Sequence, residues 1–369
     1  MRFLIIDTCY NAFLNAVYAR YSDLDQQSYN QQLRTLMDQC FGTADYYSSN
    51  LHKLGHEAKE VISNCLPMQL RWAQDHALRI RYKLHQRNFH GLPIPWLKKM
   101  WFYTVLLEQV KDYRPDVIHF QDPGGIDPTF LREIRPYVRL ITAQIACPIP
   151  SGTNFKEYDL MLSALPYYVE RFKQLGIESF YFKLGFEPNI LNYLKKEEVK
   201  LYNVVFIGGF SSSHVERIHY LEQLSQQIHV DWWGYGVECF SRKSPMRVNY
   251  HGEAWGLEMY EILSKARISI NYHGDLAGEY AVNMRLYEST GVGSMLLTDA
   301  KKNLQQLFEP GIEIVPYSSI NECIELAKYY NEHENERRSI AYAGQQRTFL
   351  EHTYYKRMEE FIEIVLRYL

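Results

Sequence analysis

The sequence has 369 residues, of which 46% are hydrophobic, and a formal net charge of −3 at pH 7. This length is sufficient for two domains that each bury a core. The near-neutral charge argues against a general nucleic-acid-binding protein, because such proteins usually have a strongly basic domain. No apolar run approaches the roughly 18 residues of a membrane-spanning helix, and the first residues turn acidic at Asp7, too early for a signal peptide. We therefore expect a cytoplasmic globular protein.

The first half of the chain alternates short β-branched runs with longer amphipathic stretches, a pattern typical of βαβ units in a parallel sheet. The predicted strands lie at residues 2–6, 56–62, 116–120, 138–143, 159–163 and 179–183.

The segment 66–111 interrupts this alternation with a helical pattern, an excess of basic residues and interleaved aromatic ones. One interpretation is a contact with an acceptor or a membrane surface. The other, which we favour, is a helical insertion whose aromatic side chains pack on the first domain. The basic and aromatic residues are Arg71, Arg79, Arg81, Lys83, Arg87, Lys98, Lys99, Lys111, Trp72, Phe89, Trp96, Trp101, Phe102 and Tyr103.

The alternation restarts near residue 203, after the charged stretch 194–200, which has no apolar face. The sequence thus predicts an α/β chain with two Rossmann-like domains, 1–195 and 203–350, joined by a linker near 190–202. Ligands of such folds bind at the carboxyl ends of the strands, so we expect a site in a cleft between the domains. In the second domain, strands are predicted at 203–207, 228–233, 247–250, 267–272, 294–298 and 312–315, and helices at 213–227, 256–266, 283–291, 320–332 and 335–349.

The strand at 203–207 runs into a loop of small residues and then into a helix. Gly208 and Gly209 allow a phosphate to approach the backbone, and the helix N-terminus offers unpaired N–H groups. Arg217, one turn into the helix, can reach the same anion. The pattern is neither a Walker A loop nor a dinucleotide fingerprint, so an ordinary βα turn is an equal alternative.

A second polar segment connects the strand at 267–272 to a helix that begins near Asn283. Arg285 and Glu288 are three residues apart and therefore share one face of this helix. Arginine pairs well with a diphosphate, and a carboxylate can accept hydrogen bonds from both ribose hydroxyls. A surface ion pair is the alternative that the residues alone leave open.

Residues 203–299 resemble the second domain of GT-B glycosyltransferases, most closely the spore-maturation-protein-like group. The run N-x-R-x-(F/Y)-E-x-x-x-x-G, followed by a strand and T-D, is present here from Asn283 to Asp299. Shorter segments also match. In the second domain they are the turn that contains Tyr235 and the loop at His251 and Gly252, which resembles the loop that contacts the base. In the first domain they are the segments 54–57, 115–120 and 184–188. Residues 351–357 resemble the start of a C-terminal helix (351–369) that returns to the first domain.

This resemblance implies a metal-independent glycosyltransferase of carbohydrate biosynthesis that uses a nucleotide-diphosphate sugar as donor. It implies that Glu288 holds the ribose, and that Arg285 and Asn283 lie near the diphosphate and the sugar. Gly208 and Gly209 match the loop near the donor phosphates. No metal or other cofactor and no nucleic acid is expected.

The stereochemistry depends on a position where this chain departs from the family. Related retaining enzymes carry a Glu-x7-Glu motif whose first Glu faces the donor sugar. Tyr280 occupies that position here, and Glu279 is one residue out of register. The donor-sugar contact and retention of configuration therefore both stay open.

An inverting reaction needs a base near the acceptor. His119, at the end of the strand at 116–120, and Asp122, in the following loop, are the predicted catalytic residues. A buried core histidine and a simple turn are the alternative interpretations. The loop 7–10 also ends at the expected cleft. The acceptor can be a glycan, a lipid-linked molecule or a small molecule, and a lipid-linked acceptor would place the protein at the inner membrane surface.

Two other functions fit the same fold. A UDP-sugar epimerase would share the nucleotide site but needs several acidic residues around the sugar, of which the sequence gives no clear set. A catalytically degenerate protein that binds a nucleotide or a carbohydrate is favoured by the missing first Glu. The presence of Arg285 and Glu288 argues against it.

Overall fold

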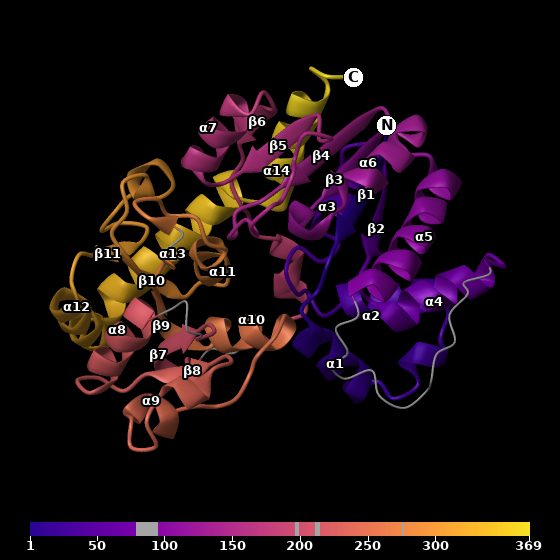
Figure 1. Ribbon diagram of the computed structural model, residues 1–369. Helices are drawn as coiled ribbons and strands as arrows, with labels where there is room; N and C mark the ends of the chain where they lie inside the picture. The colour runs from indigo at the N-terminus through magenta and orange to yellow at the C-terminus, as the bar shows by residue number, and fades with distance from the viewer. Residues whose placement is uncertain (79–94, 196–198, 211–214, 275–276) are drawn as a thin grey trace. The chain divides into compact units, whose positions relative to one another are not determined.

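A computed structural model describes residues 1–78, 95–195, 199–210, 215–274 and 277–369. Within them the chain forms two compact units, each with a parallel sheet flanked by helices (Figure 1). The first unit comprises Met1–Phe182 and Met358–Leu369, and the second comprises Lys183–Arg357.

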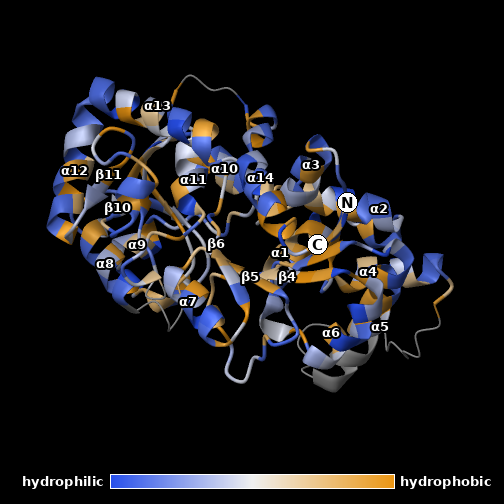
Figure 2. Cartoon of the chain, turned by 90° about the horizontal axis from the view of Figure 1, so that it is seen from above, coloured by the Kyte–Doolittle hydropathy of each residue, from blue (hydrophilic) through white to orange (hydrophobic). Residues whose placement is uncertain are grey.

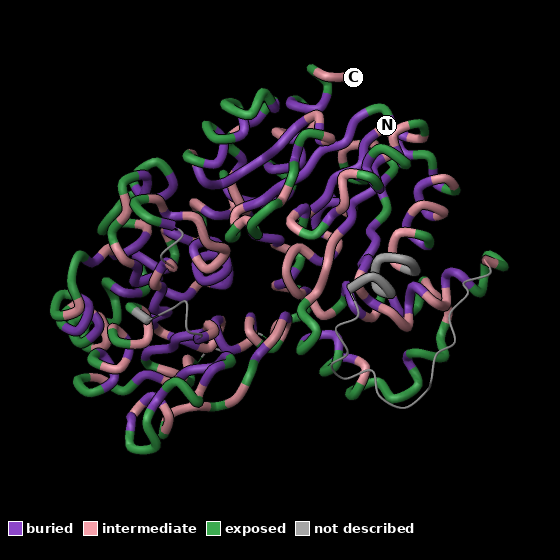
Figure 3. Tube along the Cα trace, viewed as in Figure 1, coloured by how far each residue is buried: buried purple, intermediate pink, exposed green. Residues whose placement is uncertain are grey.

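The sheet of the first unit has parallel strands in the order β2-β1-β3-β4-β5-β6. Strands β3, β4 and β5 are buried along their whole length, which explains why their sequences are mostly apolar on both faces. Figure 2 shows the hydrophobic colouring of β4 and β5, and Figure 3 shows the buried strands beneath more exposed helices and loops. The strands are β1 (Arg2–Asp7), β2 (Glu57–Ile62), β3 (Val117–Phe120), β4 (Leu140–Gln144), β5 (Leu160–Ser163) and β6 (Glu178–Tyr181).

Helices connect these strands except β4 and β5, which are joined by the irregular segment 145–159, and the last helix of the chain completes the core of this unit. Phe361 lies against Phe3, His119 and Phe182, with ring centroids 5.9, 4.9 and 6.3 Å away. The helices are α1 (Asn11–Arg20), η1 (Leu24–Gln26), α2 (Tyr29–Met37), α3 (Tyr46–Lys53), α4 (Leu66–Asp75), α5 (Pro95–Tyr113), η2 (Pro123–Gly125), α6 (Pro128–Ile134), η3 (Arg135–Tyr137), α7 (Pro166–Gln174) and α14 (Tyr354–Val365).

Helices α4 and α5 occupy the described parts of the segment 66–111. Trp72 is buried against Val105, and the Tyr103 ring stacks on Phe130 at 4.6 Å. These aromatic side chains pack within the first unit, as the favoured interpretation of the segment expects. Residues 79–94, with Arg79, Arg81, Lys83, Arg87 and Phe89, lie outside the described residues, as do the side chains of Trp96, Lys98, Lys99 and Trp101.

The sheet of the second unit has parallel strands in the order β11-β10-β9-β7-β8. The connection from β7 to β8 runs in one direction along the sheet, and the connection from β9 to β10 runs in the other. The switch point therefore lies between β7 and β9, where ligands of such sheets bind. The strands are β7 (Tyr202–Ile207), β8 (Asp231–Trp233), β9 (Ala266–Asn271), β10 (Met295–Asp299) and β11 (Val315–Tyr317).

Right-handed crossovers in opposite directions place their helices on opposite faces of a sheet. Helix α8 accordingly packs with α12, whereas α11 packs with α10 and α13. The helices are η4 (Pro188–Asn192), α8 (Val215–Ser225), η5 (Val237–Cys239), α9 (Pro245–Val248), α10 (Leu257–Ser264), α11 (Arg285–Gly291), η7 (Leu304–Gln306), α12 (Ile320–Glu332) and α13 (Glu334–Glu351).

Every predicted strand except one overlaps a strand of the structure. The prediction for 247–250 is wrong, because Pro245–Val248 forms the short helix α9. The Ser244 side chain caps this helix by accepting a hydrogen bond from the Met246 N–H at 3.1 Å, and Pro245 occupies its first position. Tyr250 makes only an isolated bridge to Trp232.

None of the helices in the described part of the chain has the length and apolar character needed to cross a bilayer.

Candidate functional site

The loop after β7 lies directly against the turn after β8. The Gly208 N–H donates to the Trp233 carbonyl at 3.0 Å, and the Phe210 N–H donates to the Tyr235 carbonyl at 2.9 Å. A Cβ atom on Gly234 would lie 2.0 Å from the Gly208 carbonyl oxygen, and Gly234 has a φ of +144°. Only glycine fits this close approach of two backbones, so the position of the Gly208 loop depends on it.

Tyr235 covers Gly209. A Cβ atom on Gly209 would lie 2.1 Å from the Tyr235 ring, so the ring packs directly on the glycine backbone. The Tyr235 side chain is 40% exposed and is nearly parallel to the Trp255 ring at 6.4 Å. The two rings form an accessible aromatic surface beside the loop.

Arg217 connects the loops that follow β7 and β9. Its Nη1 donates to the Gly209 carbonyl at 3.2 Å, and its Nη2 lies 3.3 Å from the position of a Cβ on Gly274. The guanidinium charge therefore sits at the switch point of the sheet. The remaining members of the small-residue loop, 211–214, lie outside the described residues.

Arg285 and Glu288 form a buried ion pair. Arg285 Nη1 is 2.9 Å from Glu288 Oε2, and the two side chains are only 13% and 8% exposed. Arg285 Nη2 also donates to the Ile207 carbonyl at 3.2 Å, which joins the start of α11 to the carboxyl end of β7. This pair is therefore not the solvated surface pair that the sequence left open.

The surroundings of the Glu288 carboxyl group shift its pKa in opposite directions. Burial raises the pKa, whereas the charge of Arg285 and a hydrogen bond with Tyr260 lower it, and the net result is a raised value. These two partners fix the orientation of the carboxylate. Its two oxygens offer about four acceptor positions, so further donors can bind while both partners stay in place.

Asn283 is held by a neighbouring amide. Its Nδ2 donates to Asn271 Oδ1 at 2.7 Å, and Asn271 Nδ2 donates to Thr298 Oγ1 at 3.0 Å. These bonds fix the segment before α11 on the carboxyl ends of β9 and β10. Asn283, Arg285 and the loop after β7 thus meet at the same edge of the sheet.

His251 and Gly252 lie beside strand β8. The Gly252 carbonyl accepts from the Gly234 N–H at 2.9 Å, so this loop contacts the turn that supports Gly208. His251 Nε2 is 2.7 Å from Asp231 Oδ1, and its ring stacks on Trp233 at 4.5 Å. The imidazole is therefore anchored at the outer strand of the sheet.

In the first unit, His119 lies in the core. It is fully buried in β3, its Nδ1 is 2.9 Å from Thr142 Oγ1, and its ring stacks on Tyr47 at 5.5 Å. Burial lowers the pKa of the imidazole to about 3. A histidine in this position has no access to an acceptor. His119 therefore has the geometry of a buried core histidine, the alternative to its predicted catalytic role.

Asp122 lies at the carboxyl ends of the strands of the first sheet, near Asp7. Thr8 Oγ1 donates to Asp122 Oδ2 at 2.9 Å, and the Asp7 carboxylate accepts from the Thr8 N–H at 2.7 Å and from Thr43 Oγ1 at 3.1 Å. Burial and the charge of Asp122 raise the pKa of Asp7, the two hydrogen bonds lower it, and the net value is about 6. Two carboxyl groups, one with a pKa close to neutrality, thus share one end of this sheet.

The described residues contain no group of three or more His, Cys, Asp or Glu side chains arranged to hold a metal ion.

Comparison with protein families identifies the second unit. Residues 217–363 match the family model described as glycosyl transferase-like. These residues, which make up most of the second unit, are a glycosyl transferase-like domain. No curated protein sequence matches the chain significantly.

Solved structures share the fold of this chain. HepE of Anabaena, solved with UDP-glucose, has a TM-score of 0.60 at 11% identity over 100% of both chains. Sucrose-phosphate synthase of Thermosynechococcus elongatus has a TM-score of 0.57 at 11% identity over 100% of this chain and 98% of its own. A glycosyltransferase of Rickettsia africae has a TM-score of 0.56 at 11% identity over 98% and 97%. At such low identity the likeness establishes the fold alone, with its two Rossmann-like domains.

Glu279, next to the position where this chain departs from the Glu-x7-Glu pattern, lies at the surface, whereas Tyr280 at that position is half-buried. Glu279 Oε2 is 2.7 Å from Lys302 Nζ, and both side chains are exposed. Glu279 is therefore paired on the outside of the unit, away from the buried Arg285–Glu288 pair.

The sequence predictions missed two polar residues that support the site. Asn271, the last residue of β9, orients Asn283, and Tyr260 of α10 contacts Glu288. Asn271 could have been predicted from the sequence, because it is a polar residue at the carboxyl end of a buried strand. Tyr260 carries no such signal, because its contact depends on the packing of α10 on α11.

Proposed function

We propose that this glycosyltransferase moves a sugar from a nucleotide-diphosphate donor to an acceptor hydroxyl without a bound metal ion. The observation that carries the proposal is the buried Arg285–Glu288 pair, with Arg285 bonded to the Ile207 carbonyl beside the Gly208 loop. This arrangement offers a cation and a carboxylate at the edge of the sheet where ligands of such folds bind.

In this proposal Glu288 accepts hydrogen bonds from the ribose hydroxyls, and Arg217 and Arg285 stabilise the leaving diphosphate. Preorganised cations and backbone N–H groups supply the charge stabilisation that a metal ion provides in other enzymes. The complex of HepE with UDP-glucose favours a UDP-sugar as the donor.

We further propose that the acceptor binds at the carboxyl end of the first sheet, near Asp122 and Thr8. Of the two predicted catalytic residues, Asp122 is the better placed, because His119 is enclosed in the core. If the reaction inverts configuration, Asp122 or its neighbour Asp7 would take the proton from the acceptor hydroxyl.

The test is an incubation of the full chain with UDP-, GDP- and dTDP-sugars, with and without a panel of glycan, lipid-linked and small-molecule acceptors. We expect nucleoside diphosphate release that requires an acceptor and that continues in the presence of EDTA. NMR of the product then reads the configuration at the anomeric carbon.

Three outcomes contradict the proposal. Reversible conversion of the sugar without an acceptor would indicate an epimerase. Absence of both binding and turnover would indicate a degenerate protein. Loss of activity with EDTA that Mn²⁺ restores would contradict metal independence.

A further inference from the structure

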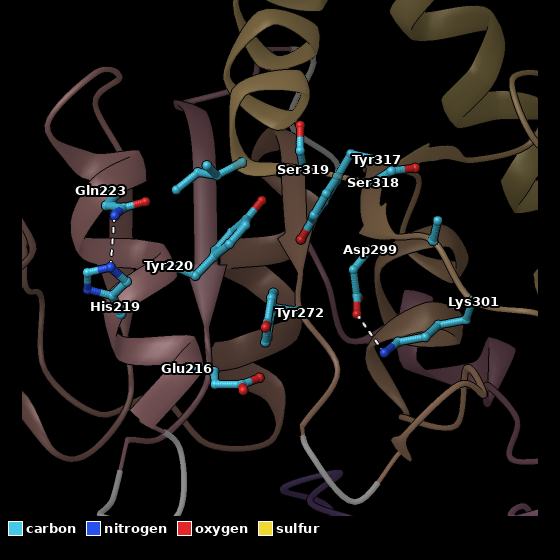
Figure 4. Close-up of a pocket in the computed structure, with 12 residues that line it drawn as sticks. Glu216, His219, Tyr220, Gln223, Tyr272, Asp299, Lys301, Tyr317, Ser318 and Ser319 are labelled. Atoms are coloured by element: carbon cyan, nitrogen blue, oxygen red, sulfur yellow. Dashed lines mark hydrogen bonds and ion pairs between the residues drawn. The ribbon is translucent and has the colours of Figure 1, made fainter.

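A cavity of about 620 Å³ opens on the second unit, and the proposed donor site does not use it. It is bordered by α8, by the carboxyl ends of β9, β10 and β11, and by the first residue of α12 (Figure 4). Its volume lies within the range of small-molecule sites, roughly 300–1,000 Å³.

The cavity and the Arg285–Glu288 pair lie on opposite faces of the sheet. The cavity lies between α8 and α12, which pack together, whereas Arg285 and Glu288 belong to α11, on the face formed with α10 and α13. Opposite crossover directions from β7 and β9 impose this separation. A ligand of the cavity therefore does not compete directly for Glu288.

Three tyrosines form the aromatic part of the cavity (Figure 4). The Tyr220 ring is 4.8 Å from that of Tyr272 and 5.7 Å from that of Tyr317, with interplanar angles of 37° and 16°. Tyr317 is buried, and its hydroxyl donates to the Asn271 carbonyl at 2.7 Å. Tyr220 and Tyr272 are half-buried, so part of each ring is available to a ligand.

Polar groups lie on two sides of these rings. Glu216 is exposed on α8, and Asp299 and Lys301 lie at the end of β10 with Lys301 Nζ 3.2 Å from Asp299 Oδ2 (Figure 4). Asp299 also lies 2.6 Å from His273 Nδ1, which fixes its carboxylate. The cavity therefore offers acceptors and a donor around an apolar centre.

The local charges disfavour an ionic ligand. The start of α12 is already capped, since the Glu322 N–H donates to Ser319 Oγ at 3.2 Å and the Ser318 N–H donates to Glu322 Oε2 at 2.6 Å. An anion would thus meet the carboxylates of Glu216 and Asp299 beside the capped start of α12. A cation would compete with Lys301, which already pairs with Asp299. A neutral molecule with hydroxyl groups and an apolar ring face fits both constraints.

We propose that this cavity binds a neutral saccharide. A pyranose ring packs its C–H face on Tyr220 and Tyr272, because an aromatic face matches an apolar ring face. Its hydroxyl groups hydrogen-bond to Glu216 and to the Asp299–Lys301 pair. This site goes beyond the proposed transfer reaction and does not depend on it.

Saturation-transfer difference NMR on the full chain tests the proposal. The probes are the methyl glycosides of glucose, galactose, mannose and N-acetylglucosamine, each titrated with and without saturating UDP. We expect at least one glycoside to bind with an affinity that UDP leaves unchanged. We expect Glu216→Gln and Tyr272→Ala each to weaken that affinity at least tenfold.

Glu325→Gln is the matched control, because Glu325 is exposed on α12 and does not line the cavity. Thermal melts verify that each variant is folded, and Glu216→Gln changes only an exposed side chain. No binding of any glycoside, displacement by UDP, or full binding by both cavity variants would overturn the proposal. The proposed donor site is tested separately, because its failure would appear as absent UDP binding in calorimetry.

Discussion

The carboxylate of Glu288 gives the sharpest test among single residues. Glu288→Gln keeps the shape of the side chain but removes its charge, so hydrogen bonds to the ribose weaken. We expect UDP affinity, measured by calorimetry, to fall by about 1.5–3 kcal/mol, roughly 10- to 150-fold.

The variant also leaves the Arg285 charge without its ion-pair partner. Removal of one partner of a buried pair costs about 3–5 kcal/mol, an upper limit here because glutamine still offers an oxygen. A thermal melt therefore accompanies the titration. Unchanged UDP affinity in a folded variant would show that Glu288 does not hold the ribose.

Asp7 predicts a pH-dependent stability. Its pKa is about 6 in the folded chain, against 3.8 for the unperturbed group. The folded state therefore binds this proton more tightly than the unfolded state, and the stabilisation is complete below about pH 4 and is lost as the pH rises through 6. Asp7→Asn avoids this loss.

We expect Asp7→Asn to raise the free energy of unfolding by about 1–3 kcal/mol near pH 7.5 and to change it little near pH 4. Urea denaturation at the two pH values measures the difference. Asp23→Asn, on an exposed residue, is the control. An equal effect of Asp7→Asn at both pH values would contradict the assigned pKa.

At the scale of elements, the pairing of the β7 loop with the β8 turn predicts a glycine requirement. Gly234→Ala places a methyl group against the Gly208 carbonyl and forces a left-handed φ on alanine. Strain and overlap together cost about 2–5 kcal/mol.

Because the displaced loop is the one proposed to meet the donor phosphates, UDP binding should weaken as well. Denaturant unfolding and calorimetry measure the two effects. Gly125→Ala is the control, since nothing lies within 4 Å of its added Cβ. A Gly234→Ala variant as stable as the parent chain would contradict the packing described.

At the scale of the whole molecule, the last residues of the chain are expected to stabilise the first unit selectively. Met358, Phe361, Ile364 and Val365 are buried in it. Each buried apolar side chain contributes about 1.5–3 kcal/mol, so a chain that ends at Arg357 should lose about 6 kcal/mol or more from this unit.

Hydrogen exchange read by mass spectrometry should show lost protection in β1 and β3 of that truncated chain and retained protection in β7, β9 and β10. A chain that ends at Val365 keeps the buried side chains and is the control. Equal loss of protection in both units would contradict the assignment of this helix to the first unit.

The sequence by itself determined the parallel α/β architecture and the position of nearly every strand. Buried parallel strands are short and mostly apolar, so β3, β4 and β5 could be predicted without a structure. Local chemistry was also sufficient to bring Arg285 and Glu288 to one helix face. The prediction failed at Ser244 and Pro245, where a helix-start signal was overlooked in favour of the alternating polar and apolar residues 247–250.

Only the tertiary structure decided what surrounds each of these side chains. His119 and Asp122 follow each other closely in the chain, yet the packing of Phe361 and Tyr47 encloses the histidine, whereas Asp122 lies at the end of the sheet. The burial of the Arg285–Glu288 pair and the raised pKa of Asp7 depend in the same way on contacts between residues distant in sequence. Periodicity specifies which face of an element is apolar, but burial and charge are set by the neighbours that folding brings together.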